Sequence, residues 1–202
     1  MDTAKFREIL RKSTEATTSE MLIISENIIE KDQENPNYFS YEAHYKAHLY
    51  HLLLTNGVRY ENLHLEWRPE PQGLTNKHID IWYSDPDGEY EFLIEVKQVY
   101  KMNGTRDNIS AHDYISGYTK GKEIKSGIIK DVIKLSAACG NNKAYSGVML
   151  MFWADPKVSE NLNLDSVRDS IVKQVKANRQ RISTTKLELL WSSSRITEYK
   201  HL

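Results

Sequence analysis

Two carboxylates and one lysine, Asp80, Glu95 and Lys97, lie on neighbouring segments of the chain that are predicted to pair. Segments 78–84 and 89–100 alternate between apolar and polar residues, and the turn sequence Asp-Pro-Asp-Gly lies between them, which predicts a β-hairpin. Residues two apart share a strand face, so Glu95 and Lys97 point the same way and the hairpin can bring Asp80 beside them. A divalent cation between the two carboxylates, next to the lysine, would offset the cost of placing them together.

These residues also carry a family resemblance. Ile79-Asp80 followed by Glu95-Val96-Lys97 resembles the motif of the PD-(D/E)xK nuclease superfamily, with Ile79 in the place of the proline. The resemblance implies a Mg²⁺-dependent phosphodiester hydrolase in which Mn²⁺ can substitute. Asp80, Glu95 and the Val96 carbonyl would bind the metal ion, and Lys97 would orient or help deprotonate the attacking water. The alternative is a solvated strand face with a weak cross-strand pair to Asp80.

A further acid is expected on the helix predicted at 40–56. Superfamily members often complete the metal site with a Glu on the helix before the sheet, and Glu42 is the matching residue. The alternative for Glu42 is structural, because the helix dipole favours a Glu in the first turn and Lys46 at i+4 would pair with it. Glu66, at the end of the strand predicted at 58–67, is a weaker acidic candidate.

Composition excludes several other classes of protein. The chain has 202 residues, of which 40% are hydrophobic, enough for a packed core. It lacks an apolar run of about 18 residues and an N-terminal secretory signal, so we expect no membrane span and a cytoplasmic location. A single cysteine, Cys139, excludes an intramolecular disulfide and a cysteine zinc cluster. A third reading is an α/β small-molecule enzyme or binding protein. The absence of Gly-rich phosphate loops argues against a nucleotide cofactor in that reading.

The charge is unevenly distributed along the chain, although the formal net charge is only −1. Residues 1–96 carry 9 Lys+Arg against 18 Asp+Glu, whereas 97–143 carry 9 against 4 and 144–202 carry 9 against 6. A basic surface after the predicted metal site is what contacts to phosphates require, although each of these residues alone could be an ordinary solvated side chain. The candidates for nucleic-acid binding are Lys101, Arg106, Lys120, Lys122, Lys125 and Lys130.

The order of predicted elements extends the resemblance beyond the motif. Apolar periodicity predicts helices at 3–30, 40–56, 122–139 and 163–181, and strands at 58–67, 78–84, 89–100, 145–154 and 186–191. Segment 14–19 is poor in apolar residues and could break the first helix, and 101–121 is predicted as a long loop. The order across 40–155 matches the αβββαβ core of the superfamily, which implies an α/β, restriction-endonuclease-like fold with a mixed central sheet flanked by helices. We therefore expect a helical extension at 1–36 and a nuclease domain at 37–202.

The sequence thus predicts a metal-dependent nuclease of a restriction, repair or defence type. It favours an endonuclease acting on DNA, and leaves RNA as an open alternative substrate and exonuclease action as an open alternative mode. A homodimer through the apolar helix at 3–30 is plausible because cutting both strands usually takes two sites. The alternative is a catalytically silent nucleic-acid-binding or assembly subunit with the same fold. The intact set of Asp80, Glu95 and Lys97 argues against that alternative.

Overall fold

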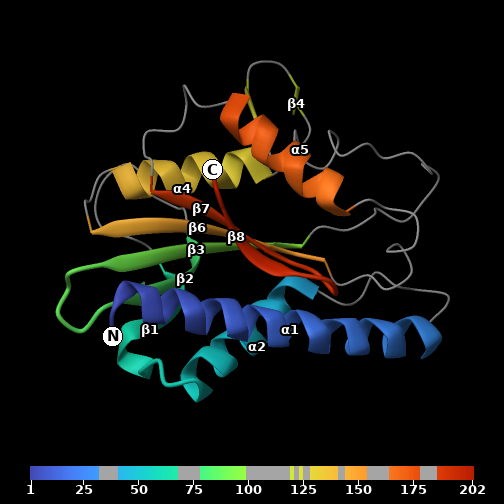
Figure 1. Cartoon of the computed structure of the whole chain (residues 1–202), viewed down its shortest axis with the longest axis horizontal. Coiled ribbons are helices and arrows are strands. Elements are labelled where there is room, and N and C mark those ends of the chain that lie inside the picture. Colours follow the sequence, from blue (N-terminus) through green and yellow to red (C-terminus); the bar gives the residue numbers. More distant parts are fainter. Residues whose placement is uncertain are drawn as a thin grey trace.

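The central feature of the fold is a six-stranded mixed sheet, seen in a computed structural model (Figure 1). The structure describes residues 1–31, 41–67, 78–98, 119–120, 123–124, 128–140, 144–153, 164–177 and 186–202. Within these ranges the sheet strands are β1 (Leu63–Trp67), β2 (Ile79–Ser84), β3 (Glu91–Gln98), β6 (Tyr145–Phe152), β7 (Leu187–Ser192) and β8 (Thr197–His201). Their order across the sheet is β1-β2-β3-β6-β7-β8.

Strand direction changes along the sheet. The pairs β1–β2, β2–β3 and β7–β8 are antiparallel, whereas β3–β6 and β6–β7 are parallel. The parallel strands are buried on both faces, and β6 accordingly has a nearly continuous apolar sequence. A separate two-stranded sheet is formed by β4 (Thr119–Lys120) and β5 (Glu123–Ile124).

Helices cover both faces of the sheet. Figure 1 shows α4 (Ile128–Gly140) and α5 (Leu164–Ala177) on one face, and α1 (Thr3–Lys31) and α2 (Tyr41–Thr55) on the other. The α/β class, the mixed sheet flanked by helices and the N-terminal helix agree with the sequence-based prediction. No helix in the described part of the chain is long and apolar enough to cross a membrane.

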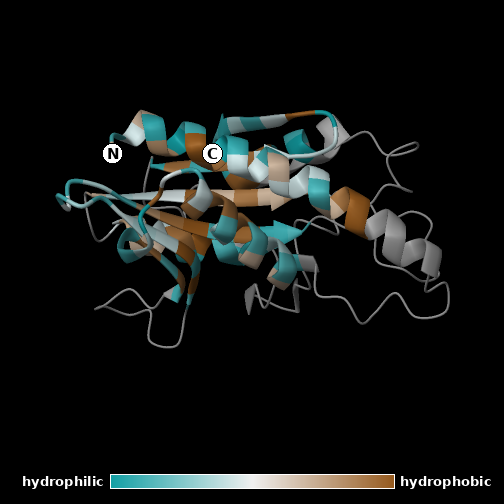
Figure 2. Ribbon diagram, turned by 90° about the horizontal axis from the view of Figure 1, so that it is seen from below, coloured by the Kyte–Doolittle hydropathy of each residue, from teal (hydrophilic) through white to brown (hydrophobic). Residues whose placement is uncertain are grey.

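Two apolar cores lie between the sheet and these helices. Alternation along β3 sends Leu93 to the core under α4 and α5, and Phe92, Ile94 and Val96 to the core under α1 and α2. In Figure 2 the hydrophobic residues are accordingly concentrated on the central strands and on the helices beside them. Glu95 also lies within the buried stretch of β3 and is only 4% exposed. A charged residue at such a position needs a specific partner.

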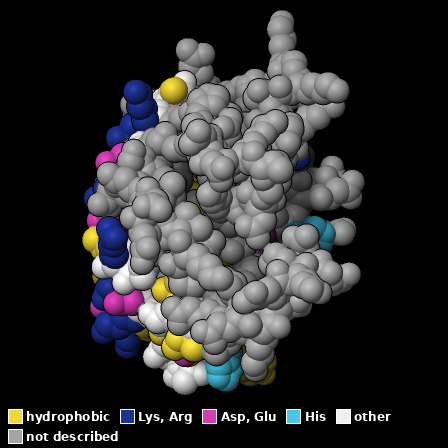
Figure 3. Space-filling model, turned by 90° about the vertical axis from the view of Figure 1, so that its right-hand side faces the viewer, with side chains coloured by type: hydrophobic (Ala, Val, Ile, Leu, Met, Phe, Trp, Pro, Cys, Tyr) yellow, Lys and Arg dark blue, Asp and Glu magenta, His cyan; other side chains and the backbone are white. Residues whose placement is uncertain are grey.

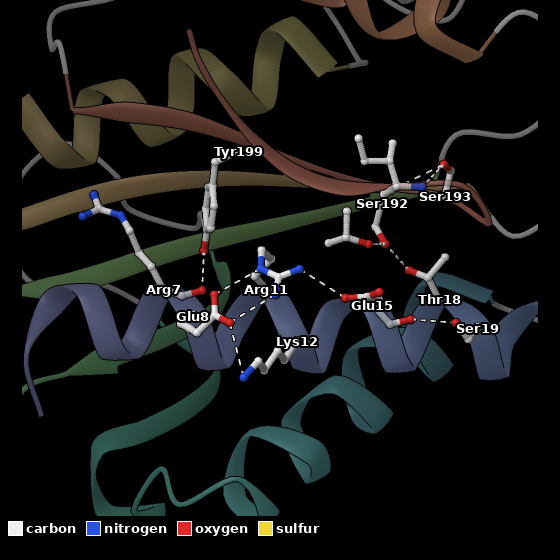
Figure 4. A network of polar contacts seen from close by, with 12 residues as sticks. Arg7, Glu8, Arg11, Lys12, Glu15, Thr18, Ser19, Ser192, Ser193 and Tyr199 are labelled. Carbon is white, nitrogen blue, oxygen red and sulfur yellow. Dashed lines mark hydrogen bonds and ion pairs between the residues drawn. The ribbon is translucent and has the colours of Figure 1, made fainter.

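Helix α1 is continuous, so the predicted break at 14–19 is wrong. Its hydroxyl-bearing residues Ser13, Thr14, Thr17 and Thr18 are buried to at least 99%. The Thr18 Oγ1 lies 2.7 Å from the Oγ of Ser192 on β7 and 3.0 Å from the hydroxyl of Tyr45 on α2. Figure 4 shows Thr18 and Ser192 facing each other across this contact. The polar stretch is therefore a buried packing face, in which Thr18 bonds to distant elements and Thr17 donates to the Ser13 carbonyl one turn back.

Other boundaries also differ from the predictions. The strand predicted at 58–67 begins only at Leu63, because Tyr60–Asn62 forms a 3₁₀ turn after Gly57 ends α2 with a positive φ of 93°. The helix predicted at 122–139 begins at Ile128, because residues 123–124 pair with β4. Strand β8 was not predicted, because its sequence Thr-Glu-Tyr-Lys-His is polar and lies at a sheet edge.

Candidate active site

The β2–β3 hairpin brings Asp80 beside Glu95. The observed register pairs Ile81 with Ile94 and Trp82 with Leu93, so Asp80 and Glu95 are the next residues along the two strands. The backbone N–H of Val96 donates a hydrogen bond of 2.8 Å to Asp80 Oδ2. The Asp80 carboxylate is therefore held against β3, at the end of the hairpin away from its turn.

Glu95 is a buried carboxylate with one cationic neighbour. Lys134 on α4 places its Nζ 2.6 Å from Glu95 Oε1 and donates to the His78 carbonyl at 3.0 Å. Burial raises the pKa of Glu95 to about 8, the negative charge of Asp80 adds to the rise, and Lys134 opposes it. Burial and the neighbouring charge of Asp80 therefore favour the protonated form of Glu95 in the metal-free protein.

The Asp80 carboxylate has a lysine partner of its own. Lys46 on α2 donates to Asp80 Oδ1 at 3.0 Å and to Glu66 Oε1 at 2.5 Å. Burial alone would lower the pKa of Lys46, but its hydrogen bonds to Glu66 and Asp80 raise it above the ordinary value. Glu66 has a left-handed backbone with φ of 51° at the end of β1. The weaker acidic candidate of the sequence is therefore connected to Asp80 through Lys46.

Lys97 lies between two further carboxylates. Its Nζ is 3.6 Å from Glu42 Oε2 on α2 and 3.5 Å from Asp131 Oδ2 on α4. Burial would lower the pKa of Lys97, but the negative charges of Glu42 and Asp131 raise it. Burial raises the pKa of Glu42, an effect that Lys97 opposes. Within the described residues Glu42 forms its ion pair with Lys97, whereas helical spacing had suggested Lys46.

These side chains form one cluster with an excess of negative charge. If every member is ionised, five carboxylates surround three ammonium groups and two negative charges remain. The elements that supply them are α2, β1, β2, β3 and α4, so both helix layers reach the open end of the hairpin. The members are Glu42, Lys46, Glu66, Asp80, Glu95, Lys97, Asp131 and Lys134. We call this set the carboxylate–lysine cluster.

The cluster fits a solvated Mg²⁺ better than an ion enclosed by protein ligands. Within the described ranges, no group of three or more His, Cys, Asp or Glu residues is arranged to hold a metal ion. Mg²⁺ usually keeps several waters and takes only one or two carboxylates from the protein. Asp80 and Glu95 would supply such a pair of hard oxygen donors once Glu95 has released its proton. The Val96 carbonyl stays a prediction, since the observed role of Val96 is to donate its amide to Asp80.

The predicted nucleic-acid contacts are only partly described by the structure. Lys130 is exposed on α4. Lys120 belongs to β4, but its side chain is outside the described part. Figure 3 shows one side of the molecule, where described Lys and Arg side chains lie along an edge beside Asp and Glu. The remaining candidates, Lys101, Arg106, Lys122 and Lys125, lie outside the described residues.

Sequence reasoning missed the roles of Lys46, Asp131 and Lys134. Asp131 and Lys134 are three residues apart on α4 and so share one helix face, but nothing local shows that this face meets β3. Lys46 shares a face of α2 with Glu42 and was read as its partner. Only the pairing of distant elements brings these residues to Asp80 and Glu95.

Comparison with known proteins does not identify the chain. No protein family and no curated protein matches it. A solved structure of SfsA from Pyrococcus furiosus in complex with Ca²⁺ is similar at a TM-score of 0.32 and 14% identity, over 79% of this chain and 63% of that chain. The chain thus spans under two thirds of that protein's length, and a likeness this low carries no argument about function.

Proposed function

We propose that the chain is a metal-dependent phosphodiester hydrolase, acting on DNA, whose centre is the open end of the β2–β3 hairpin. The proposal is supported by one observation. The β2–β3 hairpin brings Asp80 close to Glu95, where its charge raises the pKa of Glu95, and Lys97 lies two residues after Glu95 on β3. A divalent cation would offset the excess of carboxylates over lysines when all are ionised, and two acids with one lysine are the residues that metal-assisted hydrolysis uses.

Each residue has a distinct task in this proposal. Asp80 and Glu95 would hold the divalent cation, which supplies Lewis acidity and a bound water of lowered pKa. Lys97, held between Glu42 and Asp131, would donate a hydrogen bond to the attacking water and offset the charge that develops on the phosphate oxygens. Glu42 would position Lys97 through their ion pair, which gives this predicted accessory acid a task that does not require contact with the metal.

A substrate panel tests the proposal directly. Purified protein is incubated with supercoiled plasmid, linear duplex, single-stranded DNA and RNA, each with Mg²⁺, Mn²⁺ or EDTA. Cleavage of a DNA substrate that requires the metal and disappears in EDTA is expected. The matched variants are Lys97→Ala at the site and Lys12→Ala on the exposed side of α1, where Lys12 forms an ion pair with Glu8 one turn away. Equal cleavage by both variants would contradict the proposal.

A silent binding subunit is the second candidate, and one observation favours it. In the described residues Asp80 and Glu95 each already have a lysine neighbour, at 3.0 Å and 2.6 Å. A cluster that only stabilised the fold would show such pairs. Divalent-cation binding separates the two functions, because a silent cluster has no requirement for a cation and Asp80→Asn would leave nucleic-acid binding unchanged.

A further inference from the structure

Both oxygens of the Asp80 carboxylate are engaged. Oδ2 accepts the Val96 amide at 2.8 Å, and Oδ1 accepts the Lys46 ammonium at 3.0 Å. The Asp80 side chain is 13% exposed and that of Lys46 is 17% exposed, so water does little to weaken their attraction. A divalent cation in direct contact with Asp80 would therefore meet the positive charge of Lys46 at the same carboxylate.

We infer that Lys46 is an exchangeable counterion of Asp80, which leaves Asp80 for Glu66 when a divalent cation binds. The inference rests on the proposed function, because it concerns the same metal site. The Val96 amide is neutral and holds Asp80 in place in either state. The Lys46 ammonium is the group whose charge competes with the cation, so it must move or share the carboxylate at an electrostatic cost.

Glu66 provides the second position for Lys46. Its Oε1 is already 2.5 Å from the Lys46 Nζ, and its side chain is 54% exposed against 13% for Asp80. Lys46 can therefore release Asp80 without losing every carboxylate partner. Glu66 also keeps the ammonium beside the metal site and closer to solvent, where a phosphate of the substrate would arrive.

The exchange gives Lys46 a second task once it has left Asp80. A lysine ammonium has three N–H donors, and one of them would remain on Glu66. The others would be free to contact a non-bridging phosphate oxygen of the nucleic acid. Lys46 would thus connect metal binding to substrate binding, so that phosphate contacts improve after the cation is in place.

Direct metal titration tests the exchange without requiring cleavage. Mn²⁺ binding is measured by the loss of the free-ion electron paramagnetic resonance signal, with wild type, Lys46→Met, Lys46→Arg and Glu66→Gln. Lys12→Met is the matched control, because Lys12 is 66% exposed and pairs with Glu8 far from Asp80 in the sequence. Circular dichroism melts on the same samples establish that each variant is folded.

The variants are expected to change the Mn²⁺ affinity in different directions. Lys46→Met should bind Mn²⁺ several-fold more tightly than wild type, because the competing charge is gone. Lys46→Arg keeps the charge and should not bind more tightly. Glu66→Gln should bind more weakly, because Lys46 loses its second position. The control, Lys12→Met, should bind Mn²⁺ with the affinity of wild type. A purely structural Lys46 predicts weaker binding for Lys46→Met, and that result, or unchanged affinity, would overturn the inference.

The same titration separates this inference from the proposed function. If wild type binds Mn²⁺ and Asp80→Asn does not, the metal site stands, and the Lys46 variants decide the exchange alone. If wild type binds no Mn²⁺, both the metal-dependent function and the exchange are overturned. A second readout uses a duplex oligonucleotide with Ca²⁺ in place of Mg²⁺. Lys46→Met should weaken duplex binding in Ca²⁺ and leave it unchanged in EDTA.

Discussion

The chemistry of single residues at this site is set by their neighbours. Lys97 is 34% exposed between Glu42 and Asp131, whereas Lys134 is 16% exposed against Glu95. Lys97 is therefore the more accessible of the two, and Lys134 holds the Glu95 carboxylate. The Glu-x-Lys spacing predicted that Lys97 shares a strand face with Glu95, because alternation along a strand is a local property. It could not predict the contact of Lys134 with Glu95, which depends on where α4 packs.

Removal of the Lys97 ammonium should separate metal binding from catalysis. Lys97→Ala is expected to keep Mn²⁺ affinity and lose on the order of 10²–10³ in cleavage rate, the usual cost of removing one group that stabilises transition-state charge. Asp80→Asn is expected to lose both Mn²⁺ affinity and cleavage, because it removes a proposed metal ligand. Cleavage assays and Mn²⁺ titration on the same preparations check this. Wild-type cleavage rates in both variants would contradict the assignment of Asp80 and Lys97 to the active site.

The burial of Glu95 should be measurable as a pH dependence of stability in metal-free protein. The pKa of Glu95 is raised to about 8 in the folded state, whereas in the unfolded chain it is near the ordinary glutamate value. Between about pH 4.5 and pH 8 the folded protein therefore holds a proton that the unfolded chain has released, so this group makes stability fall as pH rises through that window.

Glu95→Gln should remove this contribution to the slope. Urea unfolding in EDTA at pH 5 and pH 8 is expected to show wild type losing up to a few kcal/mol relative to Glu95→Gln as the pH rises. Added Mn²⁺ should restore the stability of wild type at pH 8, because a bound ligand stabilises the folded state. Parallel pH profiles for the two proteins would show that Glu95 is not the group that titrates.

At the scale of elements, predictions succeeded where the signal was local. The hairpin was found because its turn and its alternation lie within about 20 consecutive residues. The break predicted at 14–19 was wrong because the Thr18 hydroxyl bonds to Tyr45 and Ser192, and the Thr14 carbonyl accepts a hydrogen bond from Tyr45. These partners are distant in sequence. Hydroxyl-rich stretches look like helix breaks when their partners are unknown.

The hydroxyl contacts of α1 should contribute measurable stability. Thr18→Val keeps the shape of the side chain but leaves the buried hydroxyls of Tyr45 and Ser192 with fewer partners, so it should cost about 1–3 kcal/mol. Ser19→Ala is the matched control. Ser19 is exposed, bonds only locally to the Glu15 carbonyl, and should change stability by less than about 0.5 kcal/mol. Urea denaturation measures both, and equal losses would contradict a role for this buried contact.

At the scale of the whole molecule, composition predicted a folded α/β chain but not the distribution of its charges in space. Within the described residues, the acidic N-terminal half supplies Asp80 and Glu95, and the following basic segment supplies Lys97 and Lys134. Part of the basic excess therefore neutralises the carboxylate–lysine cluster. The remaining basic residues are the candidates for contact with nucleic acid.

The salt dependence of DNA binding tests those remaining residues. Reversal of Lys122, Lys125 and Lys130 to Glu should weaken binding to all sequences alike and flatten the dependence of affinity on salt. Each lost phosphate contact should change the log–log slope by about 0.9 for duplex DNA. The Mn²⁺ affinity of this variant should equal that of wild type. Fluorescence anisotropy with a labelled duplex at several salt concentrations measures this, and an unchanged slope would assign these lysines to a solvated surface.

The contacts of α1 also set the order in which the molecule can assemble. Arg7 pairs with Glu188 at 2.9 Å, the Tyr199 hydroxyl donates to the Arg7 carbonyl, and Thr18 meets Ser192. These partners are 174 to 192 residues away in sequence. Helix α1 is synthesised before β7 and β8, so it finds these strand partners only when both strands have been made. Until then its apolar residues stay uncovered on that side, and closing so long a loop is a slow step in folding.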